Sequence, residues 1–375
     1  MTLQKNRHAV GRYARIMAFA SWLQRMPNNM TPPPFRLLQI GSAFWQSRAL
    51  YTAACLDIAT KLGEEALSAD EIANLVSAQP DAIYRLLRML TSLGVFDEIS
   101  PRIFRNNKTS NHLRDDHPES VRAMVMMHNS DVMSRPWYEH FNQGVVNGAP
   151  PFELAHGEAL FRYMDDHPEF DALFSRAMDS VEALTGDSFA TDFDWSRFTR
   201  IIDIGGSKGS KSLAILKRNP HLTALVMDRS QVIREAETFW HGQEDPAITD
   251  RMTFLAGDLF ATLPQANSDK DIYLLSAVLH ALDDHDCIKL LKNLVAASHE
   301  TGARIALMEV VMPESRADLA TTTFDLQMFA GTKGRERTLH EWQSLIDSSG
   351  LVLQEVVNLR SFASILVLST REANL

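Results

Sequence analysis

The sequence predicts an α/β protein whose C-terminal half is a Rossmann-like, doubly wound sheet and whose N-terminal half is α-helical and contains a winged helix. Three observations support this prediction. After residue 186, short apolar runs alternate with helical segments, which is typical of a mainly parallel sheet. A glycine-rich loop follows the first of these runs. Before residue 110, three helical segments precede a hairpin pattern, which is the element order of a winged helix.

Composition and charge narrow the class of protein. Of the 375 residues, 45% are hydrophobic and 22% are charged, which excludes a disordered chain, a collagen and a coiled coil. Cys55 and Cys287 are too few for a disulfide framework or a four-cysteine zinc site and favour a reducing, cytoplasmic setting. No window is long and apolar enough to predict a membrane-spanning helix.

The basic residues are concentrated at the N-terminus. Residues 1–56 contain seven basic and no acidic residues, so the remainder of the chain carries a net charge of −17. Two other classes of segment share this pattern, a transit peptide and a nucleic-acid-binding arm. The segment is poor in serine, and the acidic remainder disfavours nucleic acid. We therefore expect a helical arm at 1–34 that packs on its own subunit or on a partner subunit.

The next elements predict the winged helix at 35–110. A helix over 9–26 is expected to end near Asn28 and Asn29. The stiff connector Thr31–Pro34 follows, and a further helical pattern covers 35–62. Ser68 and Glu71 form a capping box that begins a short helix, and Gly94 ends a longer one over 82–93. Apolar pairs at 95–96 and 103–104 then suit a hairpin. Arg85 and Arg88 are the main basic residues of the third helix, too few to favour a DNA reader over a scaffold.

Residues 111–186 predict a region of helices rich in methionine and aromatic residues. Phe170, Phe174 and Met178 recur every four residues and so share one helix face. Such a face usually belongs to a hydrophobic core, but it also suits the wall of an apolar pocket.

The sheet domain is expected at 187–375. Its strands are predicted at 200–204, 223–228, 252–256, 272–278, 304–311, 351–358 and 362–369, and its helices at 210–218, 231–240, 286–299 and 338–348. Thr338 and Glu341 form a second capping box, and Gly350 is a helix stop. The last two strands follow each other directly, which predicts an antiparallel hairpin at one edge.

The glycine loop at 203–209 indicates a ligand with a nucleoside part. In open α/β sheets, ligands bind at the carboxyl ends of the strands. The loop, Asp-Ile-Gly-Gly-Ser-Lys-Gly, matches neither the dinucleotide fingerprint nor the P-loop. Asp228 ends the second strand, where a carboxylate suits ribose hydroxyls, and Gly257–Phe260 after the third strand suits an adenine. Three such features on successive strands predict a nucleoside-type ligand.

With these motifs the chain resembles the class I S-adenosylmethionine-dependent methyltransferases, and more narrowly the large dimeric O-methyltransferases of plant and bacterial secondary metabolism. The resemblance spans nearly the whole chain. It is carried by the motifs above together with 271–280, Glu309, Asp325, Met328 and 334–338. It implies S-adenosylmethionine as cofactor, S-adenosylhomocysteine as product, a homodimer formed through the N-terminal domain, an acceptor region at 111–186, and no metal.

The site residues follow from the resemblance. The cofactor would be bound by Asp203, Gly205, Gly206, Ser207, Gly209, Asp228, Arg229, Asp258, Leu259 and Ser276. The acceptor would be lined by Met127, His128, Trp137, Phe170, Phe174, Met178, Phe324 and Met328. His280 is the expected general base, because an imidazole titrating near neutral pH can take a phenol's proton. Glu309 and Glu336 are the expected carboxylates that orient it. Ala281 and Leu282 stand where the family commonly has Asp-Trp.

The leading hypothesis is therefore O-methyl transfer to an aromatic or polycyclic small molecule. One alternative keeps the cofactor but catalyses cyclisation, decarboxylation or hydroxylation, or methylates nitrogen. Another, from a different class, is a ligand-responsive regulator that binds DNA through the winged helix. His280, Asp283 and His285 resemble a metal cluster, but their spacing fits no catalytic metal site.

Overall fold

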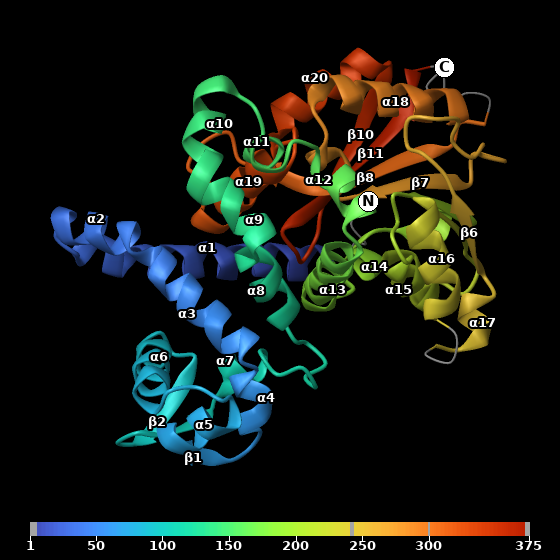
Figure 1. The fold of residues 1–375 in the computed structure, drawn as a ribbon. Coiled ribbons are helices and arrows are strands. Elements are labelled where there is room, and N and C mark those ends of the chain that lie inside the picture. Colours follow the sequence, from blue (N-terminus) through green and yellow to red (C-terminus); the bar gives the residue numbers. More distant parts are fainter. Residues whose placement is uncertain (1–5, 241–243, 299–300, 372–375) are drawn as a thin grey trace. The chain divides into compact units, whose positions relative to one another are not determined.

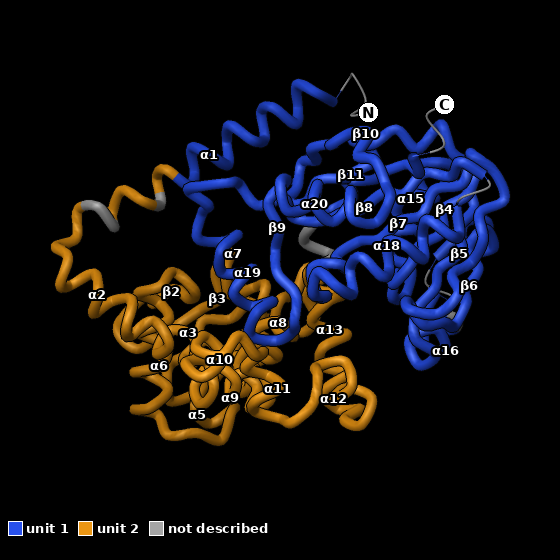
Figure 2. Tube along the Cα trace, turned by 90° about the horizontal axis from the view of Figure 1, so that it is seen from above, with its two compact units in different colours: residues 1–21, 186–375 blue, residues 22–185 orange. Residues whose placement is uncertain are grey.

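The computed structural model describes residues 6–240, 244–298 and 301–371 and divides the chain into two compact units (Figure 2). Unit 1 contains Met1–Ser21 and Gly186–Leu375, and unit 2 contains Trp22–Thr185. The first helix, α1 (Arg7–Met30), runs through the boundary between them. Within the described residues, no helix combines the length and the apolar composition needed to cross a bilayer.

The winged-helix part of unit 2 has the predicted order of elements. Its helices are α2 (Pro33–Gly41), α3 (Ala43–Cys55), α4 (Ile58–Leu62), α5 (Ala69–Leu75) and α6 (Pro80–Ser92). Its antiparallel strands, β1 (Ala66–Ser68), β2 (Phe96–Ser100) and β3 (Ile103–Asn106), are arranged in the order β1-β3-β2. The capping box of Ser68 and Glu71 begins α5 as predicted. Gly94, at φ +75°, follows the end of α6 in the left-handed conformation that glycine adopts without strain.

The connector at Thr31–Pro34 is shorter than the sequence predicts. Pro33 and Pro34 occupy the first turn of α2 instead of extending the break. Proline is accepted there because the first amide groups of a helix have no intrahelical acceptor, so the missing N–H costs nothing. The chain therefore breaks only at Thr31 and Pro32.

The rest of unit 2 is a set of short helices around an aromatic and methionine core. They are α7 (Lys108–Asn111), α8 (Arg122–Asn129), α9 (Asp131–Arg135), the π-helix η2 (Pro136–His140), α10 (Phe141–Asn147), α11 (Pro151–His156), α12 (Leu160–Asp166) and α13 (Pro168–Thr185). Buried residues from five of these helices, among them Met127, Phe152, Met164 and Phe170, form one hydrophobic cluster.

Unit 1 is a mixed sheet with helices on both faces (Figure 1). Its strands are β4 (Arg200–Ile204), β5 (Thr223–Asp228), β6 (Met252–Ala256), β7 (Asp271–Ser276), β8 (Arg304–Met312), β10 (Leu351–Asn358) and β11 (Ala363–Thr370), with the short β9 (Arg337–Thr338) beside β8. The order is β10-β11-β8-β7-β4-β5-β6. The strands from β6 to β8 are parallel, and the final hairpin is antiparallel at one edge, as predicted.

Alternating side chains of the strands face two separate cores. Ile202 and Tyr273 pack against α18 (Asp284–Ser298) and α20 (Leu339–Ser349) on one face. Ile201 and Leu274 pack against α14 (Ser188–Asp192) and α15 (Ser210–Arg218) on the other. Successive strand residues point to opposite faces of the sheet, and both faces are covered by helices. The residues on both faces must therefore be apolar, which explains the continuous apolar runs in the sequence. His299, the expected end of α18, lies outside the described residues.

The remaining elements of unit 1 connect these layers. They are the turn η3 (Trp195–Arg197), α16 (Ser230–Phe239), α17 (Pro246–Thr249), the turn η4 (Leu279–Ala281) and α19 (Leu319–Gly331). The strand order reverses at β4, since β5 lies on one side of it and β7 on the other. At such a switch point the loops that follow the strands separate and leave room for a ligand.

Candidate active site

The expected cofactor residues of unit 1 lie in the loops after β4, β5, β6 and β7. Asp203 is buried in β4, and the glycine loop follows it. Asp228 ends β5, Asp258 and Leu259 follow β6, and Ser276 ends β7. These parallel strands all end at the same edge of the sheet. The structure therefore brings the predicted cofactor residues to the carboxyl edge of one sheet, around its switch point.

The glycine loop has the backbone conformation of a ligand cradle. Gly205 and Gly209 have φ of +71° and +81°. Ser207 also has a positive φ, +52°, which is uncommon and strained for a residue with a side chain. The loop is thus held in a shape that its sequence does not favour by itself.

Gly206 is required for a different reason, the close approach of Asp203. A Cβ atom at Gly206 would lie 2.6 Å from the Cγ atom of Asp203, closer than real side chains approach. The same carboxylate accepts a 2.6 Å hydrogen bond from the Ser212 hydroxyl at the start of α15. Strand, loop and helix are therefore fixed to one another through a single buried acid.

Asp228 is oriented by two backbone amides. Its Oδ2 accepts from the N–H of Ser207 at 2.8 Å, and its Oδ1 accepts from the N–H of Arg229 at 2.7 Å. Burial raises the pKa of this carboxyl, and the two amide donors oppose the rise. The carboxylate is consequently held at the end of β5 in one orientation, as a ribose-binding acid requires.

Trp240, which the sequence analysis did not single out, contacts the glycine loop directly. Its indole Nε1–H donates a 2.8 Å hydrogen bond to the carbonyl of Lys208, and the Lys208 ammonium lies 4.5 Å from the centre of the Phe239 ring. The end of α16 thereby anchors the loop. No sequence signal marks this role, because a tryptophan at a helix end is equally suited to packing.

His280 lies in the turn η4, just beyond the end of β7, and is 9% exposed. Its Nδ1 is 2.8 Å from Oε1 of the buried Glu336. Because a carboxylate can only accept, Nδ1 carries the proton and Nε2 is left with a lone pair. The ring therefore has the tautomer that a general base at Nε2 needs.

The charges around His280 raise its pKa above the ordinary value. Burial by itself lowers the pKa, but the hydrogen bond to Glu336 and the negative charges of Glu309 and Glu336 outweigh it, while Arg337 opposes them. Oε2 of each glutamate makes no hydrogen bond with the described residues. The charges of both acids thus favour the protonated form of the imidazole, while burial raises the pKa of Glu309 itself.

Glu309 has a different place from the one expected for a second orienting carboxylate. Its Oε1 accepts from the backbone N–H groups of Val278 and Leu279, at 3.0 and 2.9 Å. Among the hydrogen bonds of the described residues, none joins it to the His280 ring. Glu309 therefore fixes the backbone that leads into His280, and acts on the imidazole through its charge.

The loop that carries Glu336 packs tightly against the turn that carries His280. A Cβ atom at Gly334 would lie 1.9 Å from the carbonyl oxygen of His280, so only glycine fits there. The N–H of Glu336 donates to Oδ1 of Asp325, in α19, at 2.9 Å. Glu336 is 4% exposed, so this acid is buried against the His280 ring and is not solvated in its loop.

The expected acceptor residues lie in both units. In unit 1, the Phe324 ring of α19 is 5.6 Å from the His280 ring, and Met328 follows one turn later. In unit 2, Met127 and Phe170 are buried in a hydrophobic cluster, and Phe174 and Met178 pack at its margin. His128 is exposed, and Trp137 stacks on Phe141 with ring centres 4.9 Å apart. Phe324 is thus the aromatic side chain of this set that contacts the candidate base.

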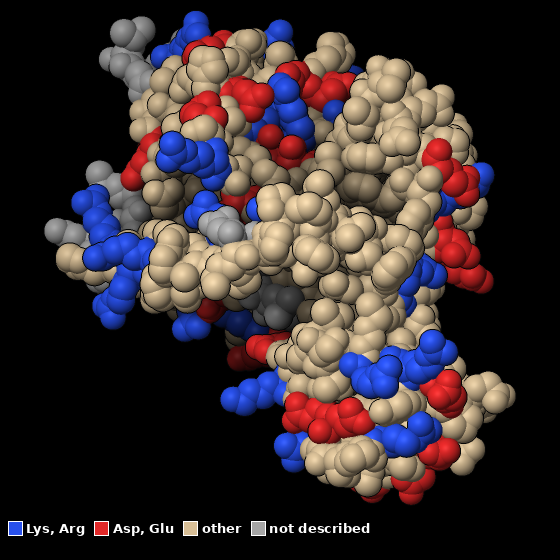
Figure 3. All heavy atoms as spheres, turned by 90° about the vertical axis from the view of Figure 1, so that its left-hand side faces the viewer, with Lys and Arg blue, Asp and Glu red and all other residues tan. Residues whose placement is uncertain are grey.

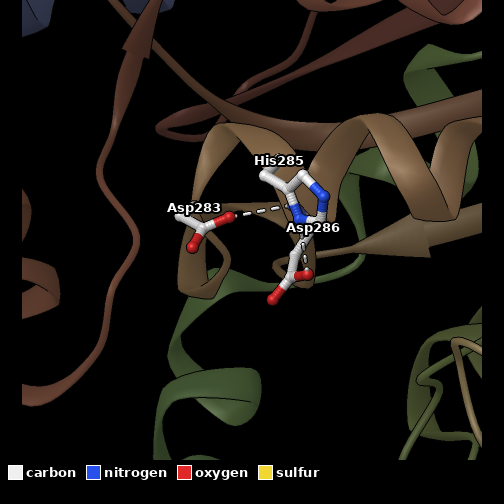
Figure 4. A group of neighbouring side chains, drawn as sticks. All are labelled: Asp283, His285 and Asp286. Carbon is white, nitrogen blue, oxygen red and sulfur yellow. Dashed lines mark hydrogen bonds and ion pairs between the residues drawn. The ribbon is translucent and has the colours of Figure 1, made fainter.

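Of the possible metal ligands, Asp283 and His285 group with Asp286, and not with His280, at the start of α18 (Figure 4). Ligand atoms of Asp283, His285 and Asp286 lie within 4.8 Å of one another. Oδ1 of Asp283 accepts from the Asp286 N–H at 2.8 Å, and His285 Nδ1 is 3.3 Å from Asp286 Oδ1. These contacts are those of a capped helix start with an exposed histidine.

Three arginines of the winged helix form ion pairs with acids, in Arg85–Asp81, Arg102–Asp70 and Arg105–Asp97. Arg88, on the third helix, lies over the Tyr84 ring. Figure 3 shows basic and acidic residues interleaved over the lobe at the bottom of the view, where β1–β3 lie. Binding to phosphates depends on clustered, available cations. This surface therefore gives no support to the DNA-binding alternative.

Comparison with known proteins agrees with this geometry. Residues 138–352 match the O-methyltransferase domain, and residues 38–115 match the O-methyltransferase dimerisation domain. The chain is 31% identical over 329 residues, 88% of its length and 94% of the relative, to the phenazine O-methyltransferase PhzM of Lysobacter antibioticus. It is 27% identical over 335 residues, 89% and 96% of the two chains, to the phenazine-1-carboxylate N-methyltransferase of Pseudomonas aeruginosa.

Solved structures give the same result. The crystal structure of LaPhzM matches with a TM-score of 0.83 at 30% identity, covering 91% of this chain and 100% of that one. CalO1, a methyltransferase of calicheamicin biosynthesis, matches in its S-adenosylhomocysteine-bound form with a TM-score of 0.76 at 26% identity, covering 90% and 98%.

Proposed function

The chain belongs to the O-methyltransferase family and is an S-adenosylmethionine-dependent methyltransferase, and from this premise we propose that it methylates a hydroxyl oxygen of an aromatic or polycyclic small molecule. The observation that carries the proposal is the 2.8 Å hydrogen bond between the His280 ring and the buried Glu336. It leaves Nε2 as a proton acceptor beside an aromatic side chain, Phe324. A base is needed for a hydroxyl acceptor, and it is not needed for an amine that is already neutral.

The residues of the sheet edge fit the cofactor. Gly205 and Gly209 hold the loop in its positive-φ conformation, and Asp228 presents a carboxylate oriented by two amides. Asp203, Gly205, Ser207 and Gly209 would shape the cradle, and Arg229, Asp258, Leu259 and Ser276 would border it. When bound, S-adenosylmethionine supplies a methyl group on a positively charged sulfur, which leaves as a neutral thioether.

The chain's own part in the reaction is to position the acceptor and to move one proton. The acceptor oxygen forms the new bond to the methyl carbon, the carbon–sulfur bond breaks, and the hydroxyl proton passes to Nε2 of His280. Glu336 accepts the Nδ1–H throughout and stabilises the imidazolium. Glu309 holds the backbone before His280, so that the ring keeps its place as its charge changes. Positioning of this kind lowers the free-energy barrier by several kcal/mol.

The acceptor contacts in unit 1 are proposed to be Phe324 and Met328 of α19, an apolar pair that suits a flat aromatic ring. The contacts expected in unit 2, namely Met127, His128, Trp137, Phe170, Phe174 and Met178, remain a prediction from the family resemblance.

We also propose that the enzyme is a cytoplasmic homodimer that forms through residues 35–110. In support, Leu37, Leu38 and Trp45 of α2 and α3 are exposed by 70%, 69% and 59%, and residues 38–115 match the dimerisation domain. Apolar surface of this extent is unusual on a monomer. The exposed thiol of Cys55 suits a reducing compartment. Light scattering that gives the mass of a single 42.1 kDa chain would refute the dimer.

The test of oxygen against nitrogen uses S-adenosylmethionine with a ¹³C-labelled methyl group. The purified enzyme is incubated with a panel of phenols, hydroxylated phenazines and the matching amines, and the methylated atom is identified from the ¹³C shift of the product. We expect O-methyl products only. N-methyl products, formed as fast by His280→Gln as by the wild type, would establish N-methyl transfer instead.

A further inference from the structure

Arg337 is a fully buried arginine whose donors are directed at the turn that carries His280. Its Nη1 donates to the carbonyl of Leu279 at 3.0 Å, and its Nη2 donates to the carbonyl of Leu282 at 2.8 Å. These two carbonyls lie on either side of His280 in the chain. A planar guanidinium with a fixed fork of donors can hold two acceptors at a set separation, which a lysine cannot.

The charge of Arg337 is balanced by Asp284 at the start of α18. Nε and Nη2 lie 3.1 and 2.8 Å from Oδ1 of Asp284, and the guanidinium lies 5.3 Å from the centre of the Trp342 ring. Asp284 also accepts from the exposed Arg335 at 2.8 Å. Burial of a charge is costly unless it is paired and hydrogen-bonded, so this arrangement needs a purpose beyond packing.

The same short segment contacts the turn at two further points. Gly334 approaches the His280 carbonyl so closely that no side chain fits between them, and Glu336 binds the His280 ring. Arg337 is the covalent neighbour of Glu336, so the hydrogen bonds of Arg337 also fix where Glu336 sits. One stretch of chain, 334–337, thus contacts both the backbone and the ring of the candidate base.

We propose that Arg337, paired with Asp284, is a positioning residue for methyl transfer: it clamps the carbonyls of Leu279 and Leu282 and so holds Nε2 of His280 in line with the acceptor. The inference rests on the proposed role of His280 as general base. It adds a residue that touches neither the cofactor nor the acceptor and acts through the backbone. An error of 1 Å in such a position costs about a hundredfold in rate.

The positive charge of Arg337 lowers the pKa of the His280 imidazole. The charged groups that act on the His280 ring are Glu309 on β8 and Glu336 beside β9, which raise its pKa, and Arg337, which lowers it. Around them, the Cys287 thiol of α18 donates to the Leu279 carbonyl, Asp325 accepts from the Glu336 N–H, and Asp284 pairs with Arg337. Burial raises the pKa of the Cys287 thiol to about 12, so it stays neutral. Removal of the Arg337 charge therefore leaves His280 among acids alone and raises its pKa further.

The test compares Arg337→Lys, Arg337→Met and Asp284→Asn with a matched control, Arg335→Met, which also loses an arginine bonded to Asp284 but touches neither carbonyl. With a phenol that the wild type methylates, we expect kcat to fall about 10- to 100-fold in both Arg337 variants and to stay within about twofold in the control. Calorimetric titration with S-adenosylhomocysteine should give an unchanged Kd throughout.

A readout without turnover is the NMR titration of the histidine side chains in the S-adenosylhomocysteine complex, with His280→Gln to assign the signal. Arg337→Met should raise the pKa of His280 relative to the wild type, and Arg337→Lys should leave it near the wild-type value while kcat still falls. Asp284→Asn keeps an acceptor oxygen, so it folds more readily than the Arg337 variants and should show an intermediate loss of kcat.

Wild-type kcat and an unchanged His280 titration in Arg337→Lys and Arg337→Met would overturn the inference. If the Arg337 variants do not fold, wild-type kcat in Asp284→Asn would overturn it equally. Failure of the proposed function gives a different result, because His280→Gln would then be as active as the wild type. An inactive His280→Gln beside a fully active Arg337→Lys would refute the clamp alone.

Discussion

Glu336→Gln is the substitution that probes the electrostatics of the candidate base most closely. It keeps an acceptor oxygen for the Nδ1–H of His280, now 2.8 Å from a carboxylate, and removes one negative charge. A hydrogen bond to a charged group contributes about 1.5–3 kcal/mol, and a neutral one about 0.5–1.5 kcal/mol. The difference, about 1–1.5 kcal/mol, corresponds to about one pKa unit.

The sign follows from the charges. Glu309 and Glu336 raise the pKa of His280 by favouring the imidazolium, so loss of the Glu336 charge lowers it. A general base acts in its neutral form, so activity rises with pH through this pKa. The acidic limb of the kcat/KM profile should therefore lie above pH 6.5 in the wild type and move about one unit lower in Glu336→Gln.

The plateau of the kcat/KM profile at high pH should fall in Glu336→Gln. The imidazolium that forms in the transition state loses a charged partner, so the plateau rate should fall about 10-fold, the rate equivalent of about 1.4 kcal/mol. The assay is S-adenosylhomocysteine release at pH 5.5 to 9.5, with Glu119→Gln, an exposed residue, as the control for net charge. An acidic limb that stays in place, or moves to higher pH, would refute the assignment of that limb to the His280–Glu336 pair.

Three further predictions concern the cradle and the fold. Gly206→Ala should raise the Kd for S-adenosylhomocysteine by at least about tenfold, because its Cβ would meet the Asp203 carboxylate at 2.6 Å. The control is Gly41→Ala, where a Cβ has open space. An equal Kd in the two variants would contradict the assignment of the glycine loop to cofactor binding. Trp240→Phe removes the hydrogen bond to the Lys208 carbonyl and should raise the same Kd about two- to tenfold with kcat unchanged; a Kd equal to that of the wild type would mean that the loop needs no such anchor. Asp192→Ala should lower the free energy of unfolding by about 3 kcal/mol in urea denaturation, because buried Asp192 accepts from Arg360 and Asn6. The control Asp187→Ala breaks the exposed pair with Arg218 and should lower it by under about 0.5 kcal/mol. Equal losses in the two variants would show that the burial of Asp192 is irrelevant.

Strand positions were well predicted from the sequence because burial on both faces makes each parallel strand an uninterrupted apolar run. The structure gives β4, β5 and β6 the predicted bounds. The strand that leads to His280 ends earlier than predicted, at Ser276, because Ala277 takes a positive φ of +53° and turns the chain. An alanine carries no sequence signal for that conformation, so the apolar strand pattern of the sequence runs on past Ser276.

The sequence predicted which residues form the candidate site better than it predicted the contacts that these residues make. His280, Glu309 and Glu336 were expected together, but the sequence could not show that Glu309 bonds backbone amides while Glu336 holds the ring. Arg337 was overlooked because arginine next to glutamate suggests an exposed ion pair. Its burial depends on Leu279 and Asp284, which are more than fifty residues away in the chain, and such long-range partners are invisible to local patterns.

The most direct test of the account is the turnover of His280→Gln on a phenol that the wild type methylates, at saturating S-adenosylmethionine and neutral pH. Glutamine fills similar space but takes up no proton. The account predicts a loss of about 10²- to 10⁴-fold in kcat, the usual contribution of a general base, with calorimetric binding of S-adenosylmethionine unchanged. A kcat within threefold of the wild type, with cofactor binding intact, would contradict the assignment of His280 as the base.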